Sequence, residues 1–186
     1  MNIKKIRFTS LAALAVLSGV AHANLVVNGG FETGDFTSWG LDPAGSGSLF
    51  GVAGGGGHSG EFFAYFGAVE FEHDEIFQSL ATSAGISYDV SIWVLNGGQG
   101  DDSLQIWWEG FVVLDMTPVT TVEGSWEEVT LQVAATTNGS ELRIGSYDVP
   151  SFNFIDDVSV EAVPEPGSIV AVSLGLGAFL LRRRKS

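Results

Sequence analysis

YDVSIWVL, residues Tyr88–Leu95, is the stretch of the sequence that decides the fold. Its side chains alternate between an aliphatic set and a more polar set: the first is Tyr88, Val90, Ile92 and Val94, and the second is Asp89, Ser91, Trp93 and Leu95. A period of two residues is typical of a β-strand with one face in the core. We therefore expect a strand whose aliphatic set points inward.

The same period recurs along the middle of the chain, between turns rich in glycine. Alternating runs cover 104–109, 129–133, 142–144 and 155–160, and turn clusters stand at 28–30, 54–57, 96–100 and 138–139. We find no long stretch with a helical period. Many short strands with frequent turns predict an all-β domain, a sandwich or barrel, over residues 24–162.

Charge is unevenly distributed along the chain. The formal net charge is −14, yet seven of the eight basic residues lie in the first seven or the last five positions. Residues 24–163 contain 21 acidic residues and one basic residue, Arg143. Such a domain repels phosphates, so we expect no nucleic-acid partner; it suits a divalent cation or a neutral ligand. The chain has no cysteine, so no disulfide stabilises it.

The N-terminal sequence has the order of a secretory signal. MNIKKIRFTSLAALAVLSGVAHA, residues 1–23, begins with basic residues, continues with an apolar stretch and ends with small residues. This order predicts a helical signal peptide that is removed, so that the mature chain begins at Asn24. A retained membrane helix is the alternative.

The C-terminal sequence VPEPGSIVAVSLGLGAFLLRRRKS, residues 163–186, joins a proline-rich motif to an apolar run and a basic end. The uncharged stretch 167–181 predicts a transmembrane helix of about 22 Å, short of a bilayer core of about 30 Å. The basic residues after it should remain on the cytoplasmic side. A permanent anchor and a sorting signal both fit these features.

The order of these parts resembles the PEP-CTERM sorting domain. The residues that carry the resemblance are Val163, Pro164, Glu165 and Pro166, and then Arg182, Arg183, Arg184 and Lys185. The resemblance implies an exosortase, a membrane-embedded cysteine protease, as partner, in a Gram-negative bacterium that makes exopolysaccharide. We therefore expect an exported precursor that is anchored transiently in the inner membrane. Its final place would be the cell surface or the extracellular matrix of a biofilm.

Three further segments carry a second resemblance. NLVVNGGFETGDFTSW at 24–39, Gly124-Ser125-Trp126 and IDDVSV at 155–160 are similar to segments of jelly-roll carbohydrate-binding modules with the galactose-binding-like fold. The resemblance implies a jelly-roll β-sandwich with Trp39 and Trp126 in the core. It also implies a structural calcium ion shared by the first and last strands, with Glu32, Asp156 and Asp157 as ligands. Ordinary solvated or capping acids are the alternative.

A sugar site needs aromatic faces flanked by hydrogen-bonding groups. If the aliphatic sets of 88–94 and 104–108 point inward, Trp93 and Trp107 point outward. We expect these two side chains to form one stacking platform, with Gln105 and Glu109 as polar partners. Packing of both tryptophans under loops or at a sheet edge is the alternative.

No catalytic pair stands out in the sequence. Residues 54–60, GGGGHSG, lack the order of a hydrolase loop, and the acidic cluster 70–75, EFEHDE, reads as a solvated loop. We therefore expect a secreted, non-catalytic surface or matrix protein associated with exopolysaccharide. The alternatives are a structural or adhesive matrix protein without a sugar site, and a glycoside hydrolase acting through the acidic cluster.

Overall fold

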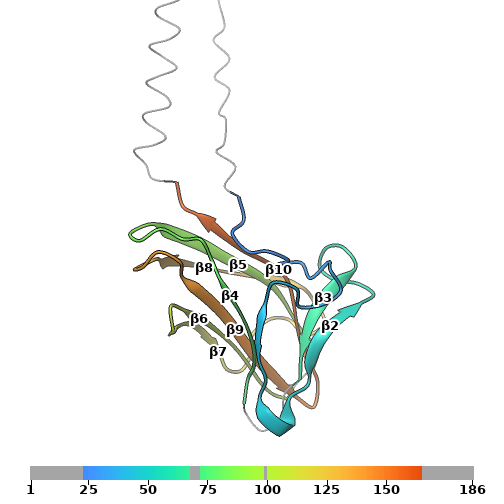
Figure 1. Cartoon of the computed structure of the whole chain (residues 1–186). Coiled ribbons are helices and arrows are strands. Elements are labelled where there is room, and N and C mark those ends of the chain that lie inside the picture. Colours follow the sequence, from blue (N-terminus) through green and yellow to red (C-terminus); the bar gives the residue numbers. More distant parts are fainter. Residues whose placement is uncertain (1–22, 68–71, 99, 165–186) are drawn as a thin grey trace, which may run out of the picture.

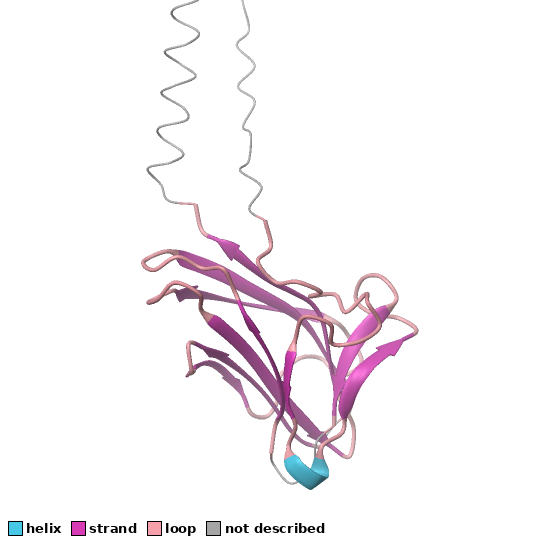
Figure 2. Ribbon diagram, in the orientation of Figure 1, coloured by secondary structure: helices cyan, strands magenta, loops and turns pink. Residues whose placement is uncertain are grey.

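The computed structural model describes residues 23–67, 72–98 and 100–164, which form two five-stranded antiparallel sheets (Figures 1 and 2). Sheet A consists, in spatial order, of β1 (Gly40–Asp42), β4 (Asp74–Ser79), β9 (Glu141–Val149), β6 (Asp101–Trp108) and β7 (Phe111–Met116). Sheet B consists of β2 (Phe50–Gly54), β3 (Phe62–Phe66), β10 (Asn153–Ala162), β5 (Ser87–Asn96) and β8 (Glu127–Ala134). One short 3-10 helix, η1 (Gly45–Gly47), follows β1. The expected all-β sandwich is confirmed.

The core lies between the sheets and follows the predicted alternation. In β5 the residues Tyr88, Val90, Ile92 and Val94 are at most 4% exposed, and in β6 the residues Leu104, Ile106 and Trp108 are at most 3% exposed. Alternating aliphatic and aromatic residues form strands because their side chains pack well on a half-buried pleated surface. The inward orientation of both sets is as expected.

The strands β5 and β6 follow each other in the chain but belong to different sheets. β5 pairs with β10 and β8, whereas β6 pairs with β9 and β7. Trp93 of β5 and Trp107 of β6 therefore lie on opposite outer faces of the sandwich. The predicted joint platform of these two tryptophans is wrong, because the connection between the strands crosses from one sheet to the other.

The two ends of the domain meet at one end of the sandwich (Figure 1). The Leu25 amide donates to the Val160 carbonyl at 2.9 Å, and the Val160 amide donates to Asn24 Oδ1 at 2.9 Å. The predicted signal peptide, apart from Ala23, and the C-terminal helix lie outside the described residues. Within the described part of the chain, no helix has the length and apolar character needed to cross a membrane.

The two tryptophans that the resemblance placed in the core behave differently. Trp39 is 7% exposed and belongs to the main core. Trp126 is half-buried and lies outside the core: its ring meets those of His58 and Phe63 nearly edge-on. The core assignment of Trp126 is therefore wrong.

Candidate functional site

Trp107 lies on the outer face of sheet A, near the end of β6. Its strand, β6, runs between β9 and β7, and Trp107 pairs with Arg143 and Val112. The indole leans over the neighbouring Gly145, since a Cβ on that glycine would lie 2.9 Å from Trp107 Cζ3. Among the described residues no ring stacks parallel to the indole; His73 approaches it at 85°, with 5.8 Å between ring centroids. The Trp107 indole is therefore half-buried and lies against the backbone of Gly145, which has no side chain in the way.

A chain of polar side chains runs beside Trp107. His73 Nε2 lies 2.9 Å from Ser103 Oγ, which lies 2.7 Å from Thr117 Oγ1. Thr117 donates to Asp115 Oδ1 at 2.8 Å, and Gln105 Nε2 donates to Asp115 Oδ2 at 3.0 Å. Burial lowers the pKa of His73, and the carboxylates of Glu75 and Asp115 oppose this effect. A neutral imidazole can both donate and accept, so the chain offers both kinds of group.

On the other side of Trp107 lies the only basic residue of the domain. Arg143 reaches Glu75 at 2.6 Å, Asp42 at 3.1 Å and Glu141 at 3.2 Å. Its guanidinium carbon also lies 4.6 Å from the centre of the Phe77 ring. Hydrogen bonds, that of Glu75 above all, raise the pKa of Arg143. The positive charge is neutralised locally, so this face is not a site for anions.

Glu109 does not join this face. β6 ends at Trp108, and Glu109 and Gly110 form the two-residue turn to β7 with φ of 51° and 82°. Positive φ values at both central residues are typical of the type I′ turn, which joins the two strands of a tight hairpin. The Glu109 carboxylate accepts hydrogen bonds from Thr136, Thr137 and Ser140. The carboxylate of Glu109 therefore holds the loop between β8 and β9, and its role as a sugar partner stays a prediction.

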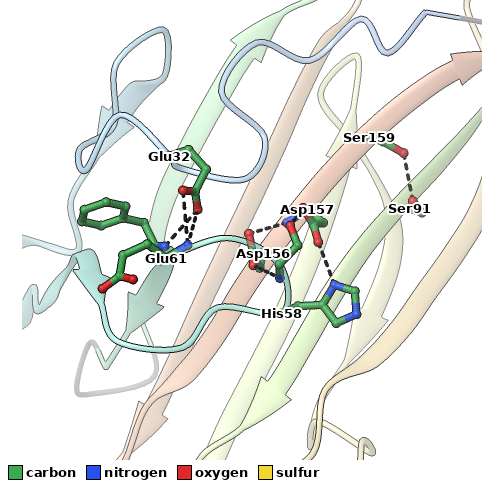
Figure 3. A network of polar contacts seen from close by, with 9 residues as sticks. Glu32, His58, Glu61, Ser91, Asp156, Asp157 and Ser159 are labelled. Atoms are coloured by element: carbon green, nitrogen blue, oxygen red, sulfur yellow. Dashed lines mark hydrogen bonds and ion pairs between the residues drawn. The ribbon is translucent and has the colours of Figure 1, made fainter.

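Trp93, on the outer face of sheet B, is covered on one side. The His58 ring stacks on it with 3.5 Å between centroids and 9° between planes. A hollow of about 340 Å³ lies beside Trp93, lined among others by Ser91, Asp157 and Ser159. A shallow polar groove of about 710 Å³ continues over β5, β8 and β10 and shares Ser91 and Ser159 with that hollow. The hydroxyls of Ser91 and Ser159 lie 2.9 Å apart, and Figure 3 shows this pair to one side of the His58 loop.

The three acids predicted to hold calcium lie around one loop, residues 55–61 between β2 and β3 (Figure 3). Glu32 accepts the backbone amides of Glu61 at 3.0 Å and Phe62 at 2.9 Å. Asp157 stands in a β-bulge of β10 with φ of 46°, and its carboxylate meets His58 Nδ1 at 2.7 Å and Ser59 Oγ at 2.8 Å.

Asp156 is fully buried beneath the same loop. It accepts the Ser59 amide at 3.1 Å and the Asp157 amide at 2.7 Å. Burial raises the pKa of Asp156 to about 6 despite these hydrogen bonds. Burial therefore makes the charged form of this carboxylate costly.

The structure thus gives these three acids loop donors as partners. A Cβ on Gly30 would lie within 3.3–3.8 Å of atoms of all three side chains, so they surround one point. No group of three or more His, Cys, Asp or Glu in the described part of the chain is arranged to hold a metal ion. The hydrogen bonds from the loop to Glu32, Asp156 and Asp157 hold the loop in place. A calcium ion bound by these three acids stays a prediction.

Several residues of the sheet A face were missed from the sequence. The cluster 70–75 was expected to be a solvated loop, yet β4 begins at Asp74, whose buried carboxylate accepts the amides of Ala44 and Leu49. The sequence signal for β4 was the alternation of side chains from His73 through Phe77. The neighbouring acidic residues obscured this alternation. Gly145 gave no sequence signal, because its role depends on a ring from another strand.

Comparisons with known proteins agree with this architecture. Residues 162–185 match the family model of the PEP-CTERM protein-sorting motif, so the chain carries that motif. No curated protein matches the chain. Among solved structures, TmCBM61 in complex with β-1,4-galactotriose has a TM-score of 0.59 at 20% identity, over 76% of this chain and 99% of that one.

Two further structures are similar. The xylan-binding CBM22-1 domain of Paenibacillus barcinonensis Xyn10C has a TM-score of 0.53 at 17% identity, over 80% of this chain and 99% of that one. The K3 adhesin domain of Lys-gingipain from Porphyromonas gingivalis has a TM-score of 0.54 at 16% identity, over 75% of this chain and 98% of that one. These similarities show that the domain has the jelly-roll β-sandwich fold of carbohydrate-binding modules.

Proposed function

We propose that this chain is a secreted, non-catalytic protein that binds a neutral extracellular polysaccharide on the outer face of sheet A. The observation that carries the proposal is the Trp107 indole lying over Gly145, with the polar chain from His73 to Gln105 beside it. A sugar ring has an apolar face and polar edges. An aromatic plate flanked by fixed donors and acceptors complements both.

The charges on this face select the class of ligand. Arg143 is engaged by three carboxylates, and Asp115 and Glu75 leave the face negative. An acidic polysaccharide would be repelled by these groups and by the surplus of acids in the whole domain. A neutral chain of hexoses or pentoses fits better.

The non-catalytic part of the proposal rests on how the carboxylates are used. Glu75 forms an ion pair with Arg143, and Asp115 accepts hydrogen bonds from Thr117 and Gln105. Glycoside hydrolysis requires one carboxyl group to stay protonated and a second to face it across the bond. Both of these acids are instead engaged by partners within the protein itself.

Location completes the proposal. The PEP-CTERM motif is typical of proteins exported and sorted by an exosortase, and its C-terminal segment anchors the precursor. We propose that the mature domain then acts at the cell surface or in the matrix, associated with the exopolysaccharide there. A structural or adhesive role without a sugar site is the second candidate, favoured by the similarity to a gingipain adhesin domain.

Binding of the full chain in detergent to a panel of neutral and acidic polysaccharides tests the proposal. Trp107→Ala should weaken binding by about 2 kcal/mol, or roughly thirtyfold in Kd, the usual effect of removing an anchoring tryptophan. Trp93→Ala, on the opposite face, is the matched control and should keep the affinity. Binding that survives Trp107→Ala would refute the site, and no binding to any polysaccharide would favour the adhesive role.

A further inference from the structure

One end of the core is polar in both sheets. The inward-facing row of β5 continues past Val94 to Asn96, and that of β9 continues past Ser146 to Asp148. The rows of β6 and β10 begin at this end, with Asp102 and Asn153. All four side chains are at most 6% exposed: Asn96, Asp102, Asp148 and Asn153. They lie at the opposite end of the sandwich from the chain termini, since β10 starts at Asn153 and ends beside Asn24 (Figure 1).

The register brings these residues together in pairs. Asp102 lies opposite Asp148 in sheet A, and Asn153 lies opposite Asn96 in sheet B. Side chains of directly opposite residues have Cβ atoms about 5 Å apart. Asn96 Nδ2 donates across the sandwich to Asp102 Oδ2 at 2.6 Å, and Asn153 Nδ2 donates to Ser146 Oγ and the Tyr147 carbonyl, each at 3.0 Å. The four side chains therefore meet in one buried space between the sheets.

This cluster is unevenly satisfied. Asp102 has a partner for each oxygen, namely the Val119 amide at 3.1 Å and Asn96. Both oxygens of Asp148 and Oδ1 of Asn153 are buried and form no hydrogen bond of ordinary length and angle with a described residue, although the Ser151 amide approaches Asp148 closely enough to act on its pKa. Two neighbouring carboxylates and an amide oxygen thus face the same space with acceptor capacity to spare. A buried unpaired carboxylate costs several kcal/mol, so a positive partner would stabilise this end of the core.

The remaining groups suggest which partner this is. Burial, together with the Asp102 carboxylate, raises the pKa of Asp148 to about 6, and the Ser151 amide opposes this rise. Arg143, the domain's only basic residue, points from the outer face of β9 to Glu75 and Asp42 and does not supply the missing charge. A cation from the medium is the remaining source.

We propose that Asp102, Asp148 and the Asn153 Oδ1 atom bind one calcium ion between the two sheets. All three supply hard oxygen atoms, and calcium takes six to eight oxygens from carboxylates, amide and backbone carbonyls in a flexible arrangement. Magnesium is less suited, because it demands near-ideal octahedral geometry. The ion would join the β5–β6 and β9–β10 connections. This site is separate from Glu32, Asp156 and Asp157, which lie under the His58 loop.

Thermal unfolding of the full chain in detergent at pH 7.5, in chelator and in calcium, tests the proposal. Wild type should melt about 10 °C higher when calcium is a hundredfold above its Kd. Asp148→Asn keeps the shape of the side chain and removes its charge. It should therefore melt higher than wild type in chelator and lose most of the calcium-dependent shift.

Glu32→Gln is the matched control and should keep the part of the shift that the site at Asp102 and Asp148 supplies. Equilibrium dialysis with calcium alone adds a measurement that does not depend on how Asp148→Asn folds. Wild type and Glu32→Gln should each bind one calcium ion per chain at this site. The proposal is overturned if Asp148→Asn keeps the full shift, or if Glu32→Gln binds no calcium. It is equally overturned if chelator and calcium give the same wild-type melting curve, because the space then holds only water or a proton.

Discussion

Gly145→Ala tests whether Trp107 works as a flat platform. The new Cβ would lie 2.9 Å from Trp107 Cζ3, 2.9 Å from Glu75 Cγ and 3.0 Å from His73 Cβ. Ordinary carbon–carbon contacts are about 3.5–4.0 Å, so the indole must move by about 0.6–1 Å. Overpacking of this size costs about 1–3 kcal/mol, and replacing a strand glycine recovers about 0.5–1 kcal/mol. We expect a net loss of about 1 kcal/mol of folding stability.

The effect on binding should be larger than this small loss suggests. A gap of 0.5–1 Å forfeits about a quarter to a half of the dispersion energy at a contact, so up to half of the roughly 2 kcal/mol due to the tryptophan is lost. This corresponds to about a fivefold rise in Kd, measured by titration with the polysaccharide that wild type binds.

Gly51→Ala is the matched control for this experiment. Gly51 lies opposite Tyr65 in sheet B, and its new Cβ would lie 2.6 Å from the Tyr65 hydroxyl oxygen. We expect it to cost a similar amount of stability and to leave binding unchanged. Equal loss of binding in both variants, or no loss in Gly145→Ala, would show that the position of Trp107 does not set the affinity.

The remaining predictions concern pH, calcium and export. Hydrogen bonds, those of Thr136 and Ser140 first, lower the pKa of Glu109 from 4.5 to about 2, so its contribution to stability is present above pH 4.5 and is lost as the pH falls towards 2. Glu109→Gln should therefore flatten the acid limb of the unfolding curve, and an unchanged limb would contradict this. If Glu32 also holds calcium, Glu32→Gln should remove a part of the calcium-dependent melting shift that exposed Glu72→Gln leaves intact; equal shifts in both would reject that site. N-terminal sequencing of surface protein should begin at Asn24, and Met1 would refute removal of the signal. Neutral residues at 182–185 should impair membrane retention or processing, as fractionation would measure, and unchanged processing would count against sorting.

Local order along the chain was enough to predict the strands β5, β6, β8, β9 and β10 and the sorting motif of the tail. A strand exposes alternate residues to opposite faces, so the spacing of Val90, Ile92 and Val94 determined which side chains enter the core. The same holds for Leu104 and Ile106 in β6. The sorting motif is also read in order along the chain, as residues 162–185 illustrate. These features need no knowledge of which strands pair.

The relations between strands were decided only by the tertiary structure. The alternation in β5 and in β6 is the same whichever sheet each joins, so it could not show that Trp93 and Trp107 face away from each other. The pairings that separate them join β5 to β10 and β6 to β9, whose paired residues are at least 34 positions apart along the chain, as Trp108 and Leu142 are. Likewise, the position of the turn at Glu109 depends on how β7 pairs with β6.

The polar end of the core shows the same limit most clearly. Asn96, Asp102, Asp148 and Asn153 each continue an ordinary alternating row, and in the sequence they read as turn residues beside glycines and proline. Only the packing of two sheets places their side chains in one buried space. Burial and the distance between charges are properties of the folded chain, and they determine whether an acid is a solvated surface group or requires a cation.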